Sequence, residues 1–267
     1  MVRLIPVTCL VTLLILLVIG TGCTSAPAPQ APEKGVTAEH TLAEITVSAT
    51  PVPSASVPDS IAAQLASVKS TNPVWKEAYR IFQNMKKTEY VHTTSVDESE
   101  GIYKFDCLGF VDYTLSRASP VAYEAASHGY AKPAIAQYAG YFSRLDTRTP
   151  NAAGWTKVAH PIDLKPGDIC LWLKPTTLDL GHMWIIAGEP KINPARTDEV
   201  LVRIFDSDGV HSDDSRAEKT YKYGLGTGVM GMMTDAKGDP TGLYWQGGNS
   251  TSPGEEDTTI VCGRLNT

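Results

Sequence analysis

The stretch Phe105–Val111 reads FDCLGFV and predicts a helix with a cysteine in its first turn. Asp106 is a good N-cap residue, because its carboxylate can accept hydrogen bonds from the free N–H groups of that turn. Those N–H groups and the helix dipole stabilise a thiolate at Cys107, and they can also stabilise the oxyanion of a tetrahedral intermediate. A cysteine beside Phe110 and Val111 is, however, more often buried and inert. Cys107 is therefore a candidate nucleophile that needs a base.

Helical patterns are predicted on both sides of this stretch. In the helix before it, Asn72 is a good N-cap, and Pro73 stands at the first helical position, where its missing N–H costs nothing. Apolar residues then recur at helical spacing: Val74, Ala78, Ile81, Phe82 and Met85. A polar stretch, His92–Gly101, breaks the pattern. The predicted helices are Asp59–Ser70, Asn72–Lys87, Cys107–Arg117 and Pro133–Leu145.

After Gly154 the chain changes to short β-like runs separated by Gly, Pro and Asp. The predicted strands are Asp168–Leu173, His182–Ala187, Val200–Phe205, Val229–Met233, Leu243–Gln246 and Thr258–Leu265. The fourth and fifth of these are expected to pair across the turn Asp235–Pro240. Helices followed by an antiparallel-type sheet predict an α+β domain.

The N-terminus has the features of an export signal. Arg3 supplies a positive charge, Leu4–Ile19 is almost wholly apolar, and small residues lead to Cys23. This pattern resembles a bacterial lipoprotein signal, in which the cysteine carries lipid and becomes the mature N-terminus, although Gly20 stands where a larger aliphatic residue is usual. Alternatively, the apolar run is an uncleaved anchor, since its length is near the lower limit for a span. Both interpretations place the rest of the chain outside the cytoplasm and tethered to a membrane.

The composition divides the chain into three parts. Residues 1–22 are the predicted signal peptide, and residues 23–58 are rich in Ala, Pro, Thr and Ser. This second segment has too few large apolar residues to offset the entropy of ordering, so we expect an extended, semi-stiff tether. Residues 59–267 are the predicted catalytic domain.

Charge and cysteine content exclude several classes of protein. The net charge of -6 is spread out with no Lys/Arg cluster, which argues against nucleic-acid binding. Five cysteines are too few for a disulfide framework, and an odd number beyond the N-terminal segment indicates a free thiol. Cys170 and Cys262 are expected to be neighbours across the sheet, either bonded or as buried free thiols. No metal site or phosphate-binding glycine loop is recognisable in the sequence, and no cofactor is expected.

Two further segments supply a base for the nucleophile and a carboxylate that could orient this base. A glycine precedes His182 at the start of a predicted strand, so the imidazole would be accessible and rigidly held, although a histidine by itself is more often structural. In the segment Val202–Gly209, Asp206 follows the next strand and is suited to hold that imidazole in the right tautomer. The alternative is a simple Asp-Gly turn at a strand end.

Asp208 competes with Asp206 for this role, because a shift of two residues along a strand returns to the same face. We expect Asp206, since His182 opens its strand and an antiparallel neighbour should meet it near that neighbour's end. His211, in the following polar loop, is kept in reserve as a third member.

In the order Cys107, His182 and Asp206, these segments resemble the NlpC-type cell-wall peptidases. That family has Asp-Cys-Ser-Gly-(aromatic or aliphatic)-Val at a helix start, then Pro-Gly-Asp before a strand, then Gly-His at the next. The matching segments here are Asp106–Val111, Pro166–Asp168 and Gly181–His182. The resemblance covers residues 103–265. It implies a papain-like fold, with N-terminal helices packed on an antiparallel sheet, that hydrolyses amide bonds of peptidoglycan stem peptides through an acyl-enzyme.

The resemblance also implies substrate contacts at Asp106, Leu108 and Tyr103. In the family, the positions beside the nucleophile and in its lead-in help to recognise the free amine of the substrate. This chain departs from the family at both places, because Leu108 replaces the usual serine and Glu100–Lys104 replaces an aromatic and Gly-Gly lead-in. The subsite chemistry is therefore expected to differ more than the reaction class.

The main hypothesis is a thiol peptidase in the cell envelope, with cell-wall peptides and the membrane as its partners. An amidase or acyltransferase on the same scaffold would use the same residues, and only its products would distinguish it. A non-catalytic, envelope-binding lipoprotein is the rival from another class, and the reactivity of the Cys107 thiol would distinguish it.

Lipidation at Cys23 predicts that the wild-type protein partitions into the detergent phase of a phase-separation assay, and that Cys23→Ala does not. Mass spectrometry of the wild type should find the mature N-terminus at Cys23. If both proteins partition identically and the signal stays uncleaved, the segment is a membrane anchor instead.

Overall fold

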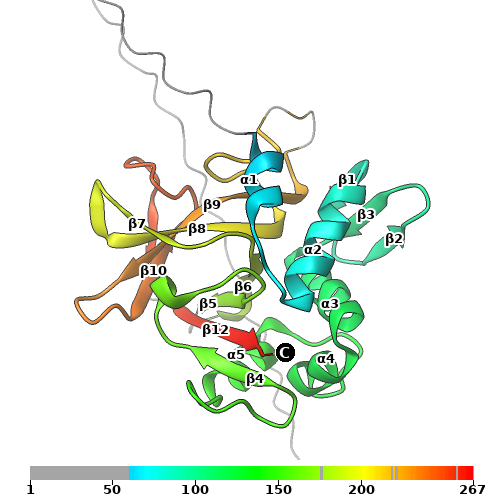
Figure 1. The fold of residues 1–267 in the computed structure, drawn as a ribbon, viewed down its shortest axis with the longest axis horizontal. Helices are drawn as coiled ribbons and strands as arrows, with labels where there is room; N and C mark the ends of the chain where they lie inside the picture. The colour runs from blue at the N-terminus through cyan, green and yellow to red at the C-terminus, as the bar shows by residue number, and fades with distance from the viewer. Residues whose placement is uncertain (1–59, 175–176, 218, 220–221, 257, 267) are drawn as a thin grey trace, which may run out of the picture. The chain divides into compact units, whose positions relative to one another are not determined.

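The computed structural model describes residues 60–174, 177–217, 219, 222–256 and 258–266, which form an α+β fold (Figure 1). Its helices are α1 (Ile61–Ser67), α2 (Pro73–Asn84), α3 (Cys107–Ala118), α4 (Pro120–Ser127) and α5 (Ile135–Ser143), with a short 3-10 helix at Pro161–Asp163. The predicted signal peptide and the whole of the predicted tether, Cys23 included, lie outside the described residues. Within the described ranges, no helix has the length and apolar character needed to cross a bilayer.

Helix α2 begins as the sequence predicts. The Asn72 side chain accepts hydrogen bonds from the backbone N–H groups of Val74 (2.9 Å) and Trp75 (3.4 Å), and Pro73 occupies the first turn. Its buried face includes Ala78 and Ile81. The Trp75 indole also donates to the carbonyl of Ala187 at 2.9 Å, which attaches this helix to the end of a central strand.

Helix α4 was not predicted, although its signal is present in the sequence. Ser119 accepts a hydrogen bond from the Ala122 N–H at 3.4 Å, and Pro120 stands at the first helical position. This is the same cap-and-proline combination that predicts α2. The turn between α3 and α4 is so short that Ser119 serves both helices, as the C-cap of α3 and the N-cap of α4.

A small sheet of three strands precedes the nucleophile's helix. Its strands are β1 (Lys87–Tyr90), β2 (Ser95–Asp97) and β3 (Ile102–Phe105), in the order β1-β3-β2. The predicted helix over Asn72–Lys87 is therefore too long, since Lys87 already belongs to β1. The polar stretch His92–Gly101 contains β2, which pairs with β3 through its backbone and does not need an apolar pattern.

The large sheet is antiparallel throughout its described ladders, with the order β11-β10-β9-β8-β6-β5-β12-β4 and β7 paired to β8. Its strands are β4 (Trp155–Val158), β5 (Ile169–Lys174), β6 (Thr177–Ile186), β7 (Lys191–Asn193), β8 (Arg196–Asp208), β9 (Gly224–Thr234), β10 (Pro240–Tyr244), β11 (Gly254–Glu256) and β12 (Thr259–Leu265). The predicted pairing across residues 235–240 is confirmed, since Thr234 of β9 pairs with Pro240 of β10.

Two apolar cores lie on opposite faces of this sheet. One joins the helices to side chains such as Leu171, Ile185 and Phe205. The other contains Trp184, Ile204 and their neighbours, and it is enclosed by the sheet itself. Strands β10 and β12 contact each other although β9, β8, β6 and β5 separate them in strand order, so the sheet curls around this second core.

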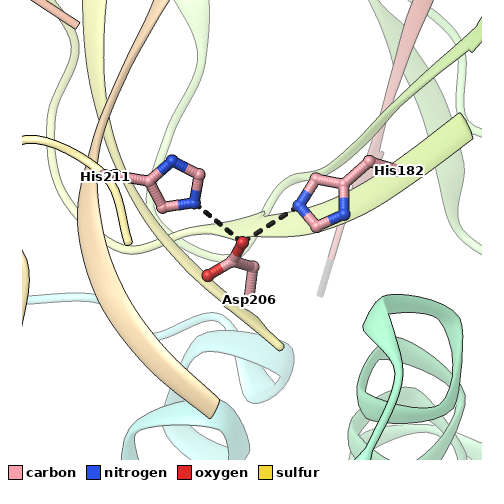
Figure 2. Close-up of side chains that lie close together, drawn as sticks. All are labelled: His182, Asp206 and His211. Carbon is pink, nitrogen blue, oxygen red and sulfur yellow. Dashed lines mark hydrogen bonds and ion pairs between the residues drawn. The ribbon is translucent and has the colours of Figure 1, made fainter. Parts of the chain in front are cut away.

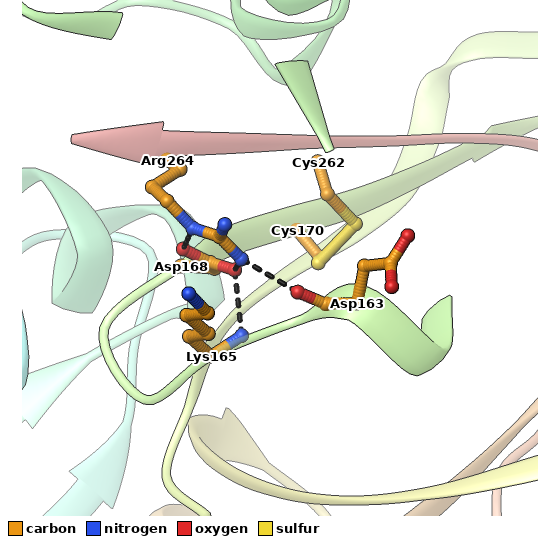
Figure 3. Close-up of a disulfide and its surroundings, with 6 residues drawn as sticks. All are labelled: Asp163, Lys165, Asp168, Cys170, Cys262 and Arg264. Atoms are coloured by element: carbon orange, nitrogen blue, oxygen red, sulfur yellow. Dashed lines mark hydrogen bonds and ion pairs between the residues drawn. A yellow bond between two sulfur atoms is a disulfide. The ribbon is translucent and has the colours of Figure 1, made fainter. Parts of the chain in front are cut away.

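The neighbouring strands β5 and β12 are joined by a disulfide and an ion pair (Figure 3). Cys170 and Cys262 are directly paired residues of neighbouring strands and form a disulfide, which resolves the two alternatives left open by the sequence. Arg264 donates to both carboxylate oxygens of the buried Asp168, at 2.9 and 2.7 Å. The Pro-Gly-Asp segment thus has a structural role in joining the start of β5 to the end of β12.

Replacing both Cys170 and Cys262 by alanine should lower the free energy of unfolding by about 2–4 kcal/mol, because the bond closes a long loop in the unfolded chain. The two cysteines are 92 residues apart in sequence. Urea unfolding under oxidising conditions measures the difference, and Cys107→Ala is the control that keeps the disulfide. Equal stability of the wild type and the double variant would contradict a structural role for this bond.

Candidate active site

Cys107 is the first residue of α3, as predicted. Asp106 is the N-cap, and its Oδ1 accepts a hydrogen bond from the Gly109 N–H at 2.7 Å. A Cβ atom at Gly109 would lie 2.5 Å from Thr94 Oγ1 and 3.1 Å from Asp106 Oδ1, so only glycine fits this capped turn. The Cys107 side chain is 6% exposed, and it is the free cysteine of the described chain.

His182 lies inside β6, since that strand begins at Thr177, and not at the start of a strand as the sequence had suggested. Its side chain is 2% exposed, so it is also less accessible than expected. Gly181 permits a close approach of β5 at this point, because a Cβ atom there would lie 2.5 Å from the carbonyl oxygen of Trp172. The glycine before the histidine therefore has a packing role.

Asp206 and Asp208 both contact this imidazole. Asp206 Oδ2 lies 3.0 Å from His182 Nε2 in hydrogen-bonding geometry, whereas Asp208 Oδ2 lies 3.3 Å from Nδ1. The argument that Asp206 follows the end of its strand was wrong, since β8 continues to Asp208. The two carboxylates differ in burial, since the Asp206 side chain is fully buried and the Asp208 side chain is 28% exposed.

The thiol of Cys107 and the imidazole of His182 interact electrostatically. Burial by itself would lower the pKa of His182, but the negative charges of Cys107 and Asp206 raise that pKa to about 10. Within the described residues, His182 Nδ1 makes no hydrogen bond. Nε2 is hydrogen-bonded to Asp206, so the nitrogen that can exchange a proton with the thiol is Nδ1, which also lies 3.3 Å from Asp208 Oδ2. The structure thus brings together the three residues that the sequence proposed as a triad.

A second histidine and an arginine bind the same carboxylate, and the sequence analysis did not assign them there. Figure 2 shows His182 and His211 on either side of Asp206, with His211 Nε2 2.8 Å from Oδ2. Arg216 Nη2 lies 3.0 Å from Oδ1. The nearness of His211 to Asp206 in sequence was the available signal for its role. No local pattern indicated Arg216, or Trp245, whose ring packs against both imidazoles in a tilted orientation.

These donors keep Asp206 ionised. Burial raises the pKa of a carboxyl group, but the charges of His211 and Arg216 and the hydrogen bond from His182 together hold the pKa of Asp206 well below its usual value. These contacts therefore favour the ionised form of Asp206 beside the imidazole of His182.

His182, Asp206 and His211 are also the described residues that could hold a metal ion, a possibility that the sequence analysis did not raise. Each offers one ligand atom, and these atoms lie within 4.8 Å of one another. As they stand, the two Nε2 atoms are at hydrogen-bonding distance from the shared oxygen. A metal ion would have to displace both Nε2 protons and share the carboxylate with the Arg216 cation.

A pocket of about 330 Å³ is lined by Asp106 and Leu108, the chain neighbours of Cys107, whereas Cys107 itself is not among its lining residues. Asp112, which the sequence analysis missed, also lines it and accepts a hydrogen bond from Tyr138 at 2.6 Å. Burial raises the pKa of Asp112 to about 7, with a further contribution from the charge of Asp106. This pocket is therefore suited to a group that offers hydrogen-bond donors next to an apolar wall.

Two tyrosines differ from the sequence-based expectation. Tyr103 is fully buried in the helical core beside Phe105, and it is not among the residues that line the pocket. Tyr90 of β1 was missed: burial and the charges of Cys107 and Asp208 raise the pKa of Tyr90. A protonated tyrosine hydroxyl thus lies in the electrostatic neighbourhood of the thiol.

Comparisons with known proteins give no family assignment. Searches of family models, curated proteins and solved structures found no match to this chain.

An NMR pH titration should find His182 still protonated at neutral pH, with a pKa of about 10. In Cys107→Ala that pKa should fall, because the charge of the thiolate is lost while the imidazole remains buried. Since the folded-state pKa lies above the ordinary value of 6.5, the interaction stabilises the fold fully below pH 6.5. The stabilisation is lost as the pH rises through 10. Identical titration of His182 in the two proteins would contradict its coupling to Cys107.

Proposed function

We propose that this protein is an exported cysteine hydrolase of the papain-like, NlpC-type kind, which cleaves amide bonds in peptidoglycan stem peptides. The observation that carries this proposal is the thiol of Cys107 at a helix start, coupled to a buried His182 that is hydrogen-bonded to Asp206. This combination supplies a nucleophile, a base and a group that orients the base.

The proposed reaction passes through an acyl-enzyme. His182 holds the proton of the thiol as an imidazolium before substrate binds, and the Cys107 thiolate of this pair attacks the carbonyl carbon of the scissile amide. The backbone N–H groups of the first turn of α3 stabilise the resulting oxyanion, and His182 then donates its proton to the leaving amine. A water molecule deprotonated by His182 hydrolyses the thioester and regenerates the thiol. Asp206 holds the imidazole in position and stabilises its charged form in both steps.

The structural roles of the motif residues support the resemblance to this family. Asp106 and Gly109 build the capped turn, Gly181 allows β5 to approach the histidine, and Asp168 bonds Arg264. Helix α3, which begins at Cys107, packs against β6, which carries His182, and this packing also agrees with a papain-like arrangement.

The sequence at the N-terminus and the disulfide support export to the cell envelope. The apolar run that ends at Cys23 resembles a lipoprotein signal. A disulfide between Cys170 and Cys262 is typical of an oxidising compartment. A membrane-tethered domain outside the cytoplasm would have direct access to cell-wall peptides.

The pocket lined by Asp106 and Leu108, which flank Cys107 in the chain, supports a peptide substrate whose recognition differs from that of the family. Asp106 already caps α3 and lies 3.3 Å from His92, so its carboxylate is partly engaged. Leu108 adds an apolar wall where the family has serine. We therefore propose weaker recognition of a free amino terminus, while the reaction class is unchanged.

Hydrolysis of cell-wall peptides predicts that the detergent-solubilised full-length protein releases peptide fragments from purified peptidoglycan, as measured by mass spectrometry. Cys107→Ala should release none above background, and Asp206→Ala should be slower than the wild type by about 100-fold or more. Alkylation of Cys107 by iodoacetamide should abolish release. Robust casein cleavage without release of muropeptides would show that the substrate class is wrong, and amine-capped products would favour an acyltransferase.

A further inference from the structure

We propose that His211 is a positioning residue of this site, which acts on His182 through the carboxylate of Asp206. The inference rests on the proposed function, because it takes His182 to be the base of Cys107. It adds a fourth residue to the Cys107, His182 and Asp206 triad.

Three buried donors fix the carboxylate of Asp206. His182 Nε2 and His211 Nε2 share Oδ2 at 3.0 and 2.8 Å, and Arg216 Nη2 binds Oδ1 at 3.0 Å. With both oxygens engaged, the plane of the carboxylate cannot rotate without breaking at least one bond to a buried group. The direction in which Oδ2 faces His182 is therefore set in part by His211.

The hydrogen-bond partners of His211 also determine which of its ring nitrogens carry a proton in this arrangement. Its Nδ1 lies 2.8 Å from the carbonyl oxygen of Trp245, and its Nε2 faces the carboxylate of Asp206. Carbonyl and ionised carboxylate oxygens only accept hydrogen bonds, so both ring nitrogens must donate and His211 is a cation here. Its charge helps to keep Asp206 ionised, and an ionised Asp206 can only accept the Nε2 proton of His182. His182 Nδ1 is then left for the thiol.

The chain around His211 holds it in place before any substrate binds. Its backbone N–H donates to Asp214 Oδ2 at 2.9 Å, and Asp214 in turn binds Arg216 at 2.7 and 2.9 Å. The Trp245 indole donates to the carbonyl of Val210 at 3.2 Å, and its ring lies 4.4 Å from that of His211. The side chain of His211 is fully buried.

Substitutions that differ only in reach test this role. Glutamine at position 211 can place an amide N–H near the position of Nε2, whereas asparagine is too short. His211→Ala and His211→Asn should lower kcat by about 10- to 100-fold, the value of one hydrogen bond to a charged group, with KM within about twofold. His211→Gln should recover most of kcat. His160→Ala is the matched control, since His160 lies apart from the site and contacts Asp239.

A double-variant cycle separates positioning from general stability. If His211 acts through Asp206, then adding His211→Ala to Asp206→Ala should cause no further loss of kcat. A further loss equal to that seen in the wild-type background would overturn the proposal. Should His211→Ala fail to fold, as judged by urea unfolding, the comparison of His211→Gln with His211→Asn decides instead, and equal kcat in these two variants would overturn it.

Alkylation of Cys107 by iodoacetamide gives a readout that needs no substrate. In His211→Ala the pH profile of alkylation should move to higher pH, and in His211→Gln it should stay near that of the wild type. If this shift occurs in a protein that releases no muropeptides, the proposed substrate is wrong and the positioning role stands. An unchanged profile in folded His211→Ala overturns the positioning role. So does activity that EDTA abolishes and Zn²⁺ restores, because the three groups would then be metal ligands.

Discussion

The buried carboxylate of Asp206 is the constraint on which the arrangement of the site depends. An ionised carboxylate removed from water is costly unless charged and hydrogen-bonded partners surround it. Here the partners come from β6, from the loop after β8 and from Arg216, which also pairs with the buried Asp214. These segments must meet at Asp206 for its buried charge to be compensated. The contacts that stabilise the fold here therefore also position the side chains of the site.

An apolar core connects this part of the sheet to the helical layer. Helix α3 packs against β6 and β8, the strands that carry His182 and Asp206. Because this contact is made by a close-packed apolar core, the start of α3 is fixed relative to the sheet. The thiol at that helix start and the imidazole on the sheet can then interact although Cys107 and His182 are 75 positions apart in the sequence. The relative position of Cys107 and His182 is thus set by a helix and a strand rather than by loops.

The sequence by itself determined those features that depend on neighbouring residues. The cap at Asp106 and the helix start at Cys107 follow from local hydrogen bonding, as does the proline-marked start of α2. Alternation and turn residues located the central strands and the hairpin of β9 and β10. The expected closeness of Cys170 and Cys262 followed from their places in two predicted strands, and they are paired in the sheet.

Only the tertiary structure decided what surrounds the imidazole of His182. The joint binding of Asp206 by His211 and Arg216 depends on how a loop folds back over β8, and no periodicity encodes that path. Sequence could not show that β6 and β8 extend past the apolar runs that predicted them, because pairing with neighbouring strands stabilises residues of any polarity. The burial of Tyr103 was hidden for a related reason: whether an aromatic side chain faces a core or a pocket depends on elements distant in the sequence that pack against it.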